Sequence, residues 1–202
     1  MGLNDKNIGK KCQFIKKCGL LSGYIADRID NNQNIKRLLK YQTRNPLGQV
    51  GISLDNKKVP QPDITESLID SDYIMNGMFD EDMSSIVKNQ IFIHVYNGNK
   101  ADMVSGQVNI AINILIDKKF EYLSNKFELR TYAIADEIEN MFSDTYIDKD
   151  NSDNDTIKDL GNLKFSLNRN SFTYSRLSKS NNIVLFTLIL TTNINPIRIG
   201  DR

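Results

Sequence analysis

The sequence predicts an α+β domain: a mainly antiparallel β-sheet with N-terminal helices and one long amphipathic helix packed across the sheet. Apolar residues follow a helical period over residues 24–40 and 127–142, and they alternate with period two over 91–116. The last predicted strands are joined by short connections, which favours antiparallel neighbours. The 202 residues, 40% hydrophobic and 25% charged, are sufficient for one ample core.

The predicted domain spans residues 24–194, between a basic N-terminal arm (1–23) and a C-terminal tail (195–202). Four lysines of the arm are candidate phosphate contacts: Lys10, Lys11, Lys16 and Lys17. No aromatic residues alternate with these lysines, so sequence-specific recognition of nucleic acid is not expected. The alternative is an arm, ordered or flexible, that is solvated or contacts another subunit.

Two helices with a break between them are predicted over residues 24–40. Apolar residues recur there at the spacing of one buried helical face: Ile25, Ile29, Ile35, Leu38 and Leu39. Asn45 precedes a proline, and a residue in that position avoids the helical conformation, so the second helix ends before it.

Residues 48–90 are the least regular part of the chain. The segment 55–63, DNKKVPQPD, contains two prolines and a turn signal, which predict an exposed loop. A long irregular insertion, here about 55–90, usually has a binding or assembly role in a compact domain. Its large apolar residues are therefore candidate subunit contacts: Tyr73, Met75, Met78 and Phe79.

A β-hairpin over residues 90–117 is the clearest prediction. β-Branched residues occupy every second position: Ile91, Ile93 and Val95, then Val108, Ile110, Ile112, Ile114 and Ile116. This alternation is typical of strands with one buried face. The connection NGNKADMVSG is expected to be a loop in which Asn97 and Gly98 adopt positive φ. It supplies further candidate subunit contacts: Asn97, Asn99, Lys100, Asp102 and Met103.

An amphipathic helix of about four turns follows the hairpin. One stripe is apolar: Phe127, Ile134, Ile138, Met141 and Phe142. Polar residues lie elsewhere on the helix: Arg130, Asp136, Glu137 and Glu139. Two or three strands then close the chain, from the segments NLKFSL, SFTYSRL and NIVLFTLILTT. Because the last is apolar on both faces, we expect it at the centre of the sheet.

His94 is the only histidine, and it lies in the first hairpin strand on the face opposite Ile91 and Ile93. A metal site needs several converging ligands, and there is no second histidine. A nucleophilic triad needs a serine or cysteine with an orienting acid, and no G-x-S-x-G motif is present. A hydrogen-bonded histidine between Phe92 and Tyr96, on an aromatic sheet face, accounts for the residue without catalysis.

The acidic tract 144–159 matches a calcium-binding EF-hand loop only in part. With Asp148 as the first position, Asp150 and Ser152 occupy the third and fifth. The sixth is Asp153 instead of the required glycine, and the twelfth is Asp159 instead of glutamate. We therefore expect a solvated loop, with adventitious binding of divalent ions as the alternative.

No catalytic, cofactor-binding or metal site is predicted. The glycine-containing segments 19–23 and 97–106 match no phosphate-binding motif. Cys12 and Cys18 are separated by five residues and are expected to be thiols, with a disulfide as the alternative. The formal net charge of +1 does not indicate nucleic acid as the main partner. The chain is not expected to be an enzyme; a site made of carboxylates is the remaining enzymatic option.

The order of these elements resembles that of small bacteriophage neck proteins: tail terminators, tail-completion proteins and head–tail connectors. The matching parts are the helices IADRIDNNQNIKRLLKY, the segment NPLGQVGI, the hairpin IFIHVYNG…VNIAINILI, the helix FELRTYAIADEIENMF and the closing strands. The resemblance covers about residues 24–194. The chain departs from the family in its long 55–90 segment and its acidic 144–159 tract.

The resemblance implies a structural virion protein, assembled in the host cytoplasm, that forms a homo-oligomeric ring joining head and tail components. Its partners would be other neck and tail proteins, with passing contact to DNA in the lumen as an option, and no membrane. The alternative function is a small nucleic-acid-associated module that uses the basic arm. Salt-dependent retention on DNA, lost when the four arm lysines are changed to alanine, would favour that alternative.

Overall fold

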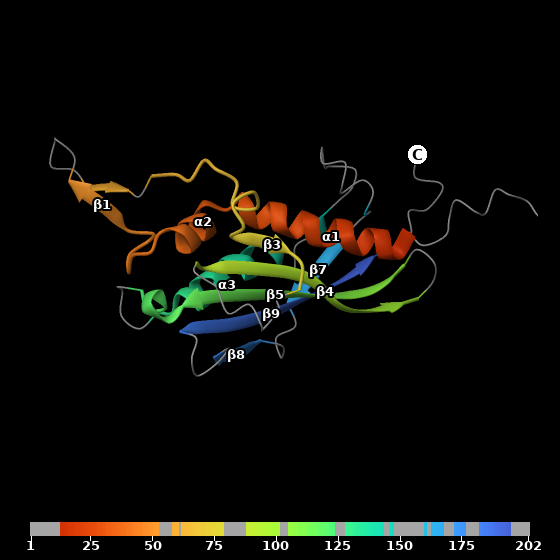
Figure 1. The fold of residues 1–202 in the computed structure, drawn as a ribbon. Coiled ribbons are helices and arrows are strands. Elements are labelled where there is room, and N and C mark those ends of the chain that lie inside the picture. Colours follow the sequence, from red (N-terminus) through yellow and green to blue (C-terminus); the bar gives the residue numbers. More distant parts are fainter. Residues whose placement is uncertain are drawn as a thin grey trace, which may run out of the picture.

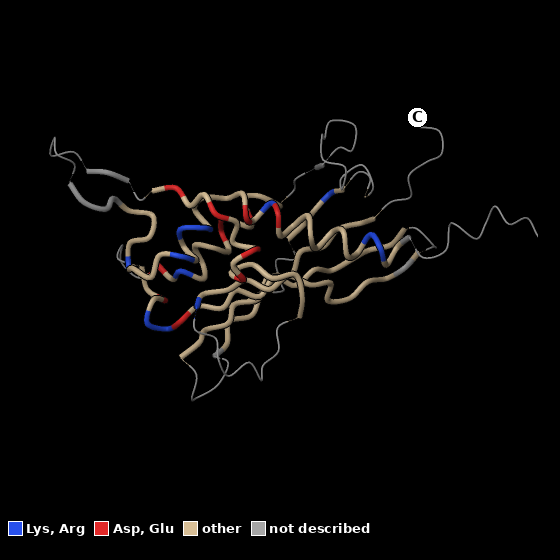
Figure 2. The backbone as a smooth tube through the Cα atoms, turned by 45° about the horizontal axis from the view of Figure 1, so that its top comes forward, with Lys and Arg blue, Asp and Glu red and all other residues tan. Residues whose placement is uncertain are grey.

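The computed structural model describes residues 13–52, 58–60, 62–78, 88–101, 105–123, 128–143, 146–147, 160, 163–167, 172–176 and 182–194. It confirms an α+β domain in which the helices pack on one face of a mostly antiparallel sheet (Figure 1). The long sheet strands carry few charged residues, which gather instead on the helices and connections (Figure 2). No helix within the described ranges is both long and apolar enough to cross a membrane.

The main sheet has the strand order β3-β4-β5-β9-β7-β6, and β8 also pairs with β9. The strands are β3 (Ile74–Asn76), β4 (Gln90–Lys100), β5 (Gly106–Asp117), β6 (Tyr146–Ile147), β7 (Leu163–Leu167), β8 (Thr173–Arg176) and β9 (Ile183–Ile194). Only the β3–β4 pair is parallel. Strand β9 pairs with β5 on one side and with both β7 and β8 on the other, which confirms the predicted central strand.

The hairpin β4–β5 has longer strands and a shorter connection than predicted. Its pairing runs from Gln90↔Leu115 to Lys100↔Gly106, with a bulge between Val95 and Asn97. The expectation of a turn at Asn97 and Gly98 is wrong, because both residues lie within β4. The connection is confined to residues 101–105. Asp72 (φ 58°) is the non-glycine residue that adopts positive φ within the described ranges.

The core lies between the helices and one face of the sheet. Alternating residues of the three long strands are fully buried there: Ile91, Ile93, Ile110, Ile112, Ile114 and Leu190. Helix α3 (Arg130–Phe142) contributes Ile134, Ile138 and Phe142, as its apolar stripe predicts. The other sheet face has a smaller cluster around Phe92, Leu115 and Ile183.

Helices α1 (Gln13–Asp30) and α2 (Gln33–Lys40) confirm the predicted helix, break, helix pattern. Helix α1 begins at Gln13, so much of the predicted arm 1–23 is helical and belongs to the domain. Phe14 packs against the backbone of Gly98, which joins the start of α1 to the far end of the hairpin.

Asn32 connects α2 to α3. Its side-chain oxygen accepts hydrogen bonds from the amides of Asn34 (2.9 Å) and Ile35 (3.1 Å), so that it caps α2. Its amide nitrogen donates to Glu137 Oε2 at 3.0 Å, and Asn34 donates to Glu137 Oε1 at 2.7 Å. The side chain of Asn32 therefore supplies a hydrogen-bond acceptor for the free amides at the start of α2 and also fixes α3 against that helix.

Changing Asn32 to alanine is expected to lower the free energy of unfolding by about 1–2 kcal/mol, because the cap and the bond to Glu137 are lost together. Urea denaturation measures the loss. Asn140→Ala is the matched control, since Asn140 is exposed within α3 and alanine favours helix. Equal stabilities for the two variants would show that the cap is dispensable.

The segment 62–78 is fastened to the two N-terminal helices. Buried Lys36 lies 3.4 Å from Asp30 and donates to the carbonyl of Glu66 at 2.7 Å. Asp30 accepts from the amide of Leu68 at 2.7 Å. These bonds satisfy two buried charges and bring β3 to the edge of β4.

A small second sheet pairs β1 (Gln49–Ile52) with β2 (Lys58–Pro60). The predicted loop over 55–63 is therefore wrong for residues 58–60. Pro60 is the last residue of its strand, where a missing amide hydrogen costs no ladder bond.

Candidate functional site

A groove of about 520 Å³ lies between α3 and the β8–β9 edge of the sheet. Its apolar lining comes from helix and strands together: Tyr132, Ala135, Leu167, Phe172, Phe186 and Leu188. Its acidic rim consists of Glu128, Asp136 and Glu139. We call this feature, with the adjoining Tyr174, the aromatic groove.

The aromatic side chains form one connected group. Tyr132 stacks on Tyr174 (ring centroids 6.2 Å apart) and meets Phe186 edge-on at 5.2 Å. Phe172 stacks on Phe186 at 5.8 Å. Phe172, Tyr132 and Tyr174 are nevertheless 55%, 44% and 40% exposed. Stacking aligns the rings while leaving contiguous apolar surface in water, which is typical of an interaction site.

Two of the rim acids, Asp136 and Glu139, share one face of α3 with Tyr132. Positions 132, 135, 136 and 139 follow the three- and four-residue spacing of a helical face. Among the described residues, no Lys or Arg forms an ion pair with Glu128, Asp136 or Glu139. The groove therefore combines aromatic faces with carboxylates that have no cationic partner in the described part of the chain.

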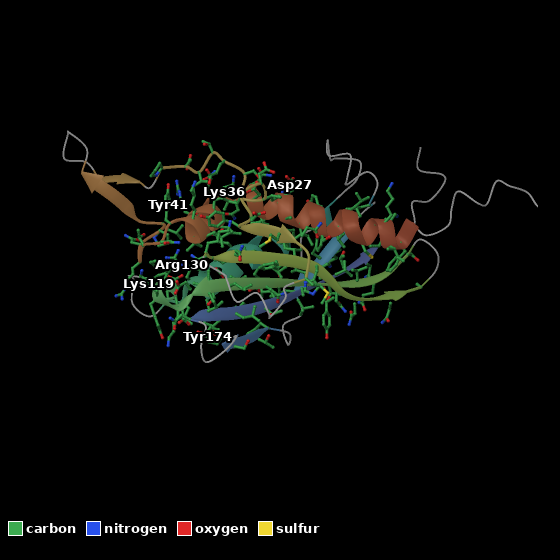
Figure 3. The ribbon with its side chains drawn as sticks, in the orientation of Figure 1. Asp27, Lys36, Tyr41, Lys119, Arg130 and Tyr174 are labelled. Carbon is green, nitrogen blue, oxygen red and sulfur yellow. The ribbon has the colours of Figure 1, made fainter. Side chains whose placement is uncertain are left out.

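Tyr174 also holds the short strand β8 in place. Its hydroxyl donates to the carboxylate of Glu121, a buried side chain just after the 3₁₀ turn Lys118–Phe120. Figure 3 shows Tyr174 at the β8 edge of the sheet. The exposed ring is thus fixed by its polar end, which preorganises this side of the groove.

A second hollow, of about 450 Å³, lies at the far end of the hairpin. It is lined by Asn99, Ala101, Ser105, Gly106, Gln107, Asn193 and Ile194. A ladder of side-chain hydrogen bonds crosses the strands nearby, from Asn109 to Asn97 (2.5 Å) and from Thr191 to Asn109 (2.7 Å). Asn99, Ala101 and Gln107 are exposed around this hollow, whereas Ser105 and Ile194 are buried.

Two of the predicted subunit contacts in the hairpin fall at this end of it. Asn97 and Asn99 are exposed residues of β4. Asp102, Met103 and the side chain of Lys100 lie outside the described residues.

The predicted contacts in the 55–90 segment do not share one surface. Tyr73 packs on the main core, with the Lys88 ammonium 4.6 Å from its ring centroid. Met75 packs against the smaller cluster. Met78 is exposed, and Phe79 lies outside the described residues.

The candidate phosphate contacts do not share one described surface. Lys16 is exposed on α1, whereas Lys17 is only 5% exposed. Lys10 and Lys11 lie outside the described residues. Cys12 does as well, and Cys18 is a free thiol whose pKa is raised by burial.

His94 is partly buried in β4 and pairs with Ala111 across the hairpin. The expected hydrogen bond is absent at one nitrogen: Nδ1 is buried and has no partner within the described ranges. Burial lowers the pKa of the imidazole. No group of three or more His, Cys, Asp or Glu able to hold a metal occurs in the described residues, and the tract 148–159 falls outside them.

Stability is expected to fall as the pH drops below about 6.5, the ordinary histidine pKa. The unfolded chain binds a proton at His94 there more readily than the folded chain, so protonation favours unfolding. Urea midpoints between pH 7.5 and 5.5 measure the effect, and His94→Gln should flatten the curve because no other histidine is present. An unchanged slope in that variant would contradict this prediction.

Sequence reasoning did not identify the aromatic groove. Its aromatic residues come from three segments, 132, 172–174 and 186, and none of these segments shows a motif. The available signal was a second stripe on α3. In it the aromatic Tyr132 lies on the same face as the acids Asp136 and Glu139, where a polar residue would be ordinary.

A model of the YomW family matches residues 32–178. The matched span runs from just before α2 through β8, and includes Tyr132, Phe172 and Tyr174. The family is named after a gene product of a Bacillus phage region, which indicates a phage-associated protein. No curated protein matches the chain.

Proposed function

The chain belongs to the YomW family, and from this premise we propose that it is a structural virion protein. In this proposal it is the subunit of an oligomeric ring in a phage neck or tail, of the tail-terminator or head–tail-connector type. It joins head and tail components and assembles in the host cytoplasm.

The exposed aromatic surface at the β8 edge is the observation that carries this proposal. Tyr132, Phe172 and Tyr174 form apolar surface beside a short edge strand, all of whose described side chains are exposed. Soluble proteins usually protect such an edge, because its unpaired backbone groups and apolar side chains recruit other chains. A subunit covered by its neighbours in a particle needs no such protection.

The two edges of the sheet favour a ring over a symmetric dimer. One edge presents β3 and then the end of β4 at the hairpin, whereas the other presents β6 and, beside the aromatic groove, β8. Surfaces that differ in chemistry pair heterologously, and heterologous contacts close into rings when the rotation between subunits permits.

Light scattering and native mass spectrometry of the purified chain test the proposal, with electron microscopy to show whether particles are annular. We expect a single closed stoichiometry larger than a dimer. A strictly monomeric species at all concentrations, including in the presence of its virion partners, would overturn the proposal. Portal, capsid and tail genes beside the coding gene would support it.

A further inference from the structure

We propose that the aromatic groove receives the lysine-containing segment 1–12 of a second copy of the chain. This inference rests on the proposed ring, since it names the contact by which one subunit holds the next. The groove is acidic and aromatic, and the segment that it binds is cationic.

Charge complementarity favours this occupant. The groove rim has three carboxylates, Glu128, Asp136 and Glu139, with no cationic partner among the described residues. Segment 1–12, MGLNDKNIGKKC, has three lysines and one aspartate, with Leu3 and Ile8 as apolar residues. Lysine ammonium groups bind carboxylates and also the faces of aromatic rings, and the exposed faces of Tyr132 and Phe172 offer such positions.

The proposed head-to-tail ring favours a second copy over the same chain as the donor of this segment. Phe14, at the start of α1, packs on Gly98 of β4, while the groove lies at β8 and β9. Strand β5 and strand β9 separate β4 from β8 in the sheet, and α3 covers that part of its helical face (Figure 1). Twelve extended residues span at most about 40 Å, enough to leave the subunit and reach a neighbour.

Docking of this kind gives each subunit one donated segment and one receiving groove. The two surfaces are different parts of the molecule, so the contact repeats head to tail around an assembly. The groove's volume of about 520 Å³ accommodates a few side chains of the donated segment.

Two full-length charge-reversed variants test the inference. The segment variant carries Lys6→Glu, Lys10→Glu and Lys11→Glu, and the groove variant carries Asp136→Lys and Glu139→Lys. We expect each alone to lose the wild-type oligomer at 0.15 M salt, measured by light scattering. An equimolar mixture should form a 1:1 pair, because one variant retains the groove and the other the segment. A chain carrying all five changes should recover the oligomer.

A binding measurement gives an answer that does not depend on ring formation. A fluorescein-labelled peptide of residues 1–12 is titrated onto the full-length segment variant and followed by anisotropy. Binding should weaken at least about tenfold when Tyr132→Ala or the two groove reversals are added. Tyr96→Ala, at an exposed tyrosine of β4, and Asp27→Lys, at an exposed acid of α1, are the matched controls and should leave binding unchanged.

The outcomes separate this inference from the proposed function. An oligomer that persists in both reversed variants overturns the groove contact and leaves the ring intact. A monomeric wild-type chain whose groove still binds the peptide overturns the ring and keeps the contact. The inference is overturned if the mixture forms no 1:1 pair, or if Tyr132→Ala leaves the affinity for the peptide unchanged.

Discussion

Changing Arg130 to methionine is expected to lower the free energy of unfolding by about 3–5 kcal/mol, a large part of the stability of a typical domain. Arg130 is 0% exposed. Its guanidinium donates to the carbonyls of Leu38, Tyr41 and Thr43, and its Nε donates to the carbonyl of Phe120 at 2.8 Å. Without it, four backbone acceptors in two separate segments, the carbonyl of Leu38 in a buried bond and the other three in part-buried bonds, lose their donor at once.

The position of Arg130 explains why a cation is tolerated in the interior. The last carbonyls of a helix have no partner within the helix and carry partial negative charge, which a cation offsets. Arg130 reaches that end of α2 from the first turn of α3, near Tyr41 (Figure 3). Burial lowers the pKa of the guanidinium to about 10, so the group stays charged at neutral pH.

Urea denaturation of three variants measures this effect. Arg130→Lys should recover only part of the loss, because an ammonium cannot reproduce the planar fork of donors. Arg28→Met is the control, since Arg28 is exposed on α1 and its replacement should change stability by less than about 0.5 kcal/mol. Equal stability of Arg130→Met and the wild-type chain would show that water replaces the guanidinium at those carbonyls.

Changing Phe142 to alanine is expected to cost about 3–5 kcal/mol through the cavity that it leaves. Phe142 ends α3, is fully buried, and meets Phe165 of β7 edge-on with ring centroids 5.3 Å apart. The pair fixes the end of the helix to the short strand β7 of the sheet.

Phe172→Ala provides a matched comparison, because the same atoms are removed from a half-exposed ring of the groove. It should cost less than about 1 kcal/mol. A double-mutant cycle with Phe142→Leu and Phe165→Leu should give a coupling of about 0.5–1.5 kcal/mol for the aromatic contact. A coupling of zero would mean that the two rings contribute only through their separate burial.

The regular parts of the fold could be predicted from the sequence because their signals are local. Alternation over Ile110–Ile116 places one set of side chains in the core whichever strand lies alongside. The same holds for the stripe of Ile134 and Ile138 on α3, and for β9, whose two apolar faces require a central position.

Non-local contacts account for what could not be predicted. Arg130 was assigned to the polar side of its helix, yet three of its four acceptors lie about ninety residues earlier, at and just after the end of α2. Asn97 and Gly98 form a local turn signal, but pairing with Asn109 and Val108 extends the strand through them. The candidate groove combines residues from three separate segments, so no single window of sequence contains it.

The pairing of β9 has a consequence for the order in which the sheet forms during synthesis. The hairpin β4–β5 can close as soon as residue 117 leaves the ribosome, since its strands adjoin in the chain. The other edge of β5 stays unpaired until β9 has been synthesised. In the pair Ile114↔Phe186, for example, the chain between the two residues spans most of the C-terminal half of the protein. Until then β5 has an unpaired edge lined with isoleucine, and the nascent chain is most prone to associate with other chains in this interval. Translation of the last strand ends that exposure, so the order of the strands determines when the sheet can be completed.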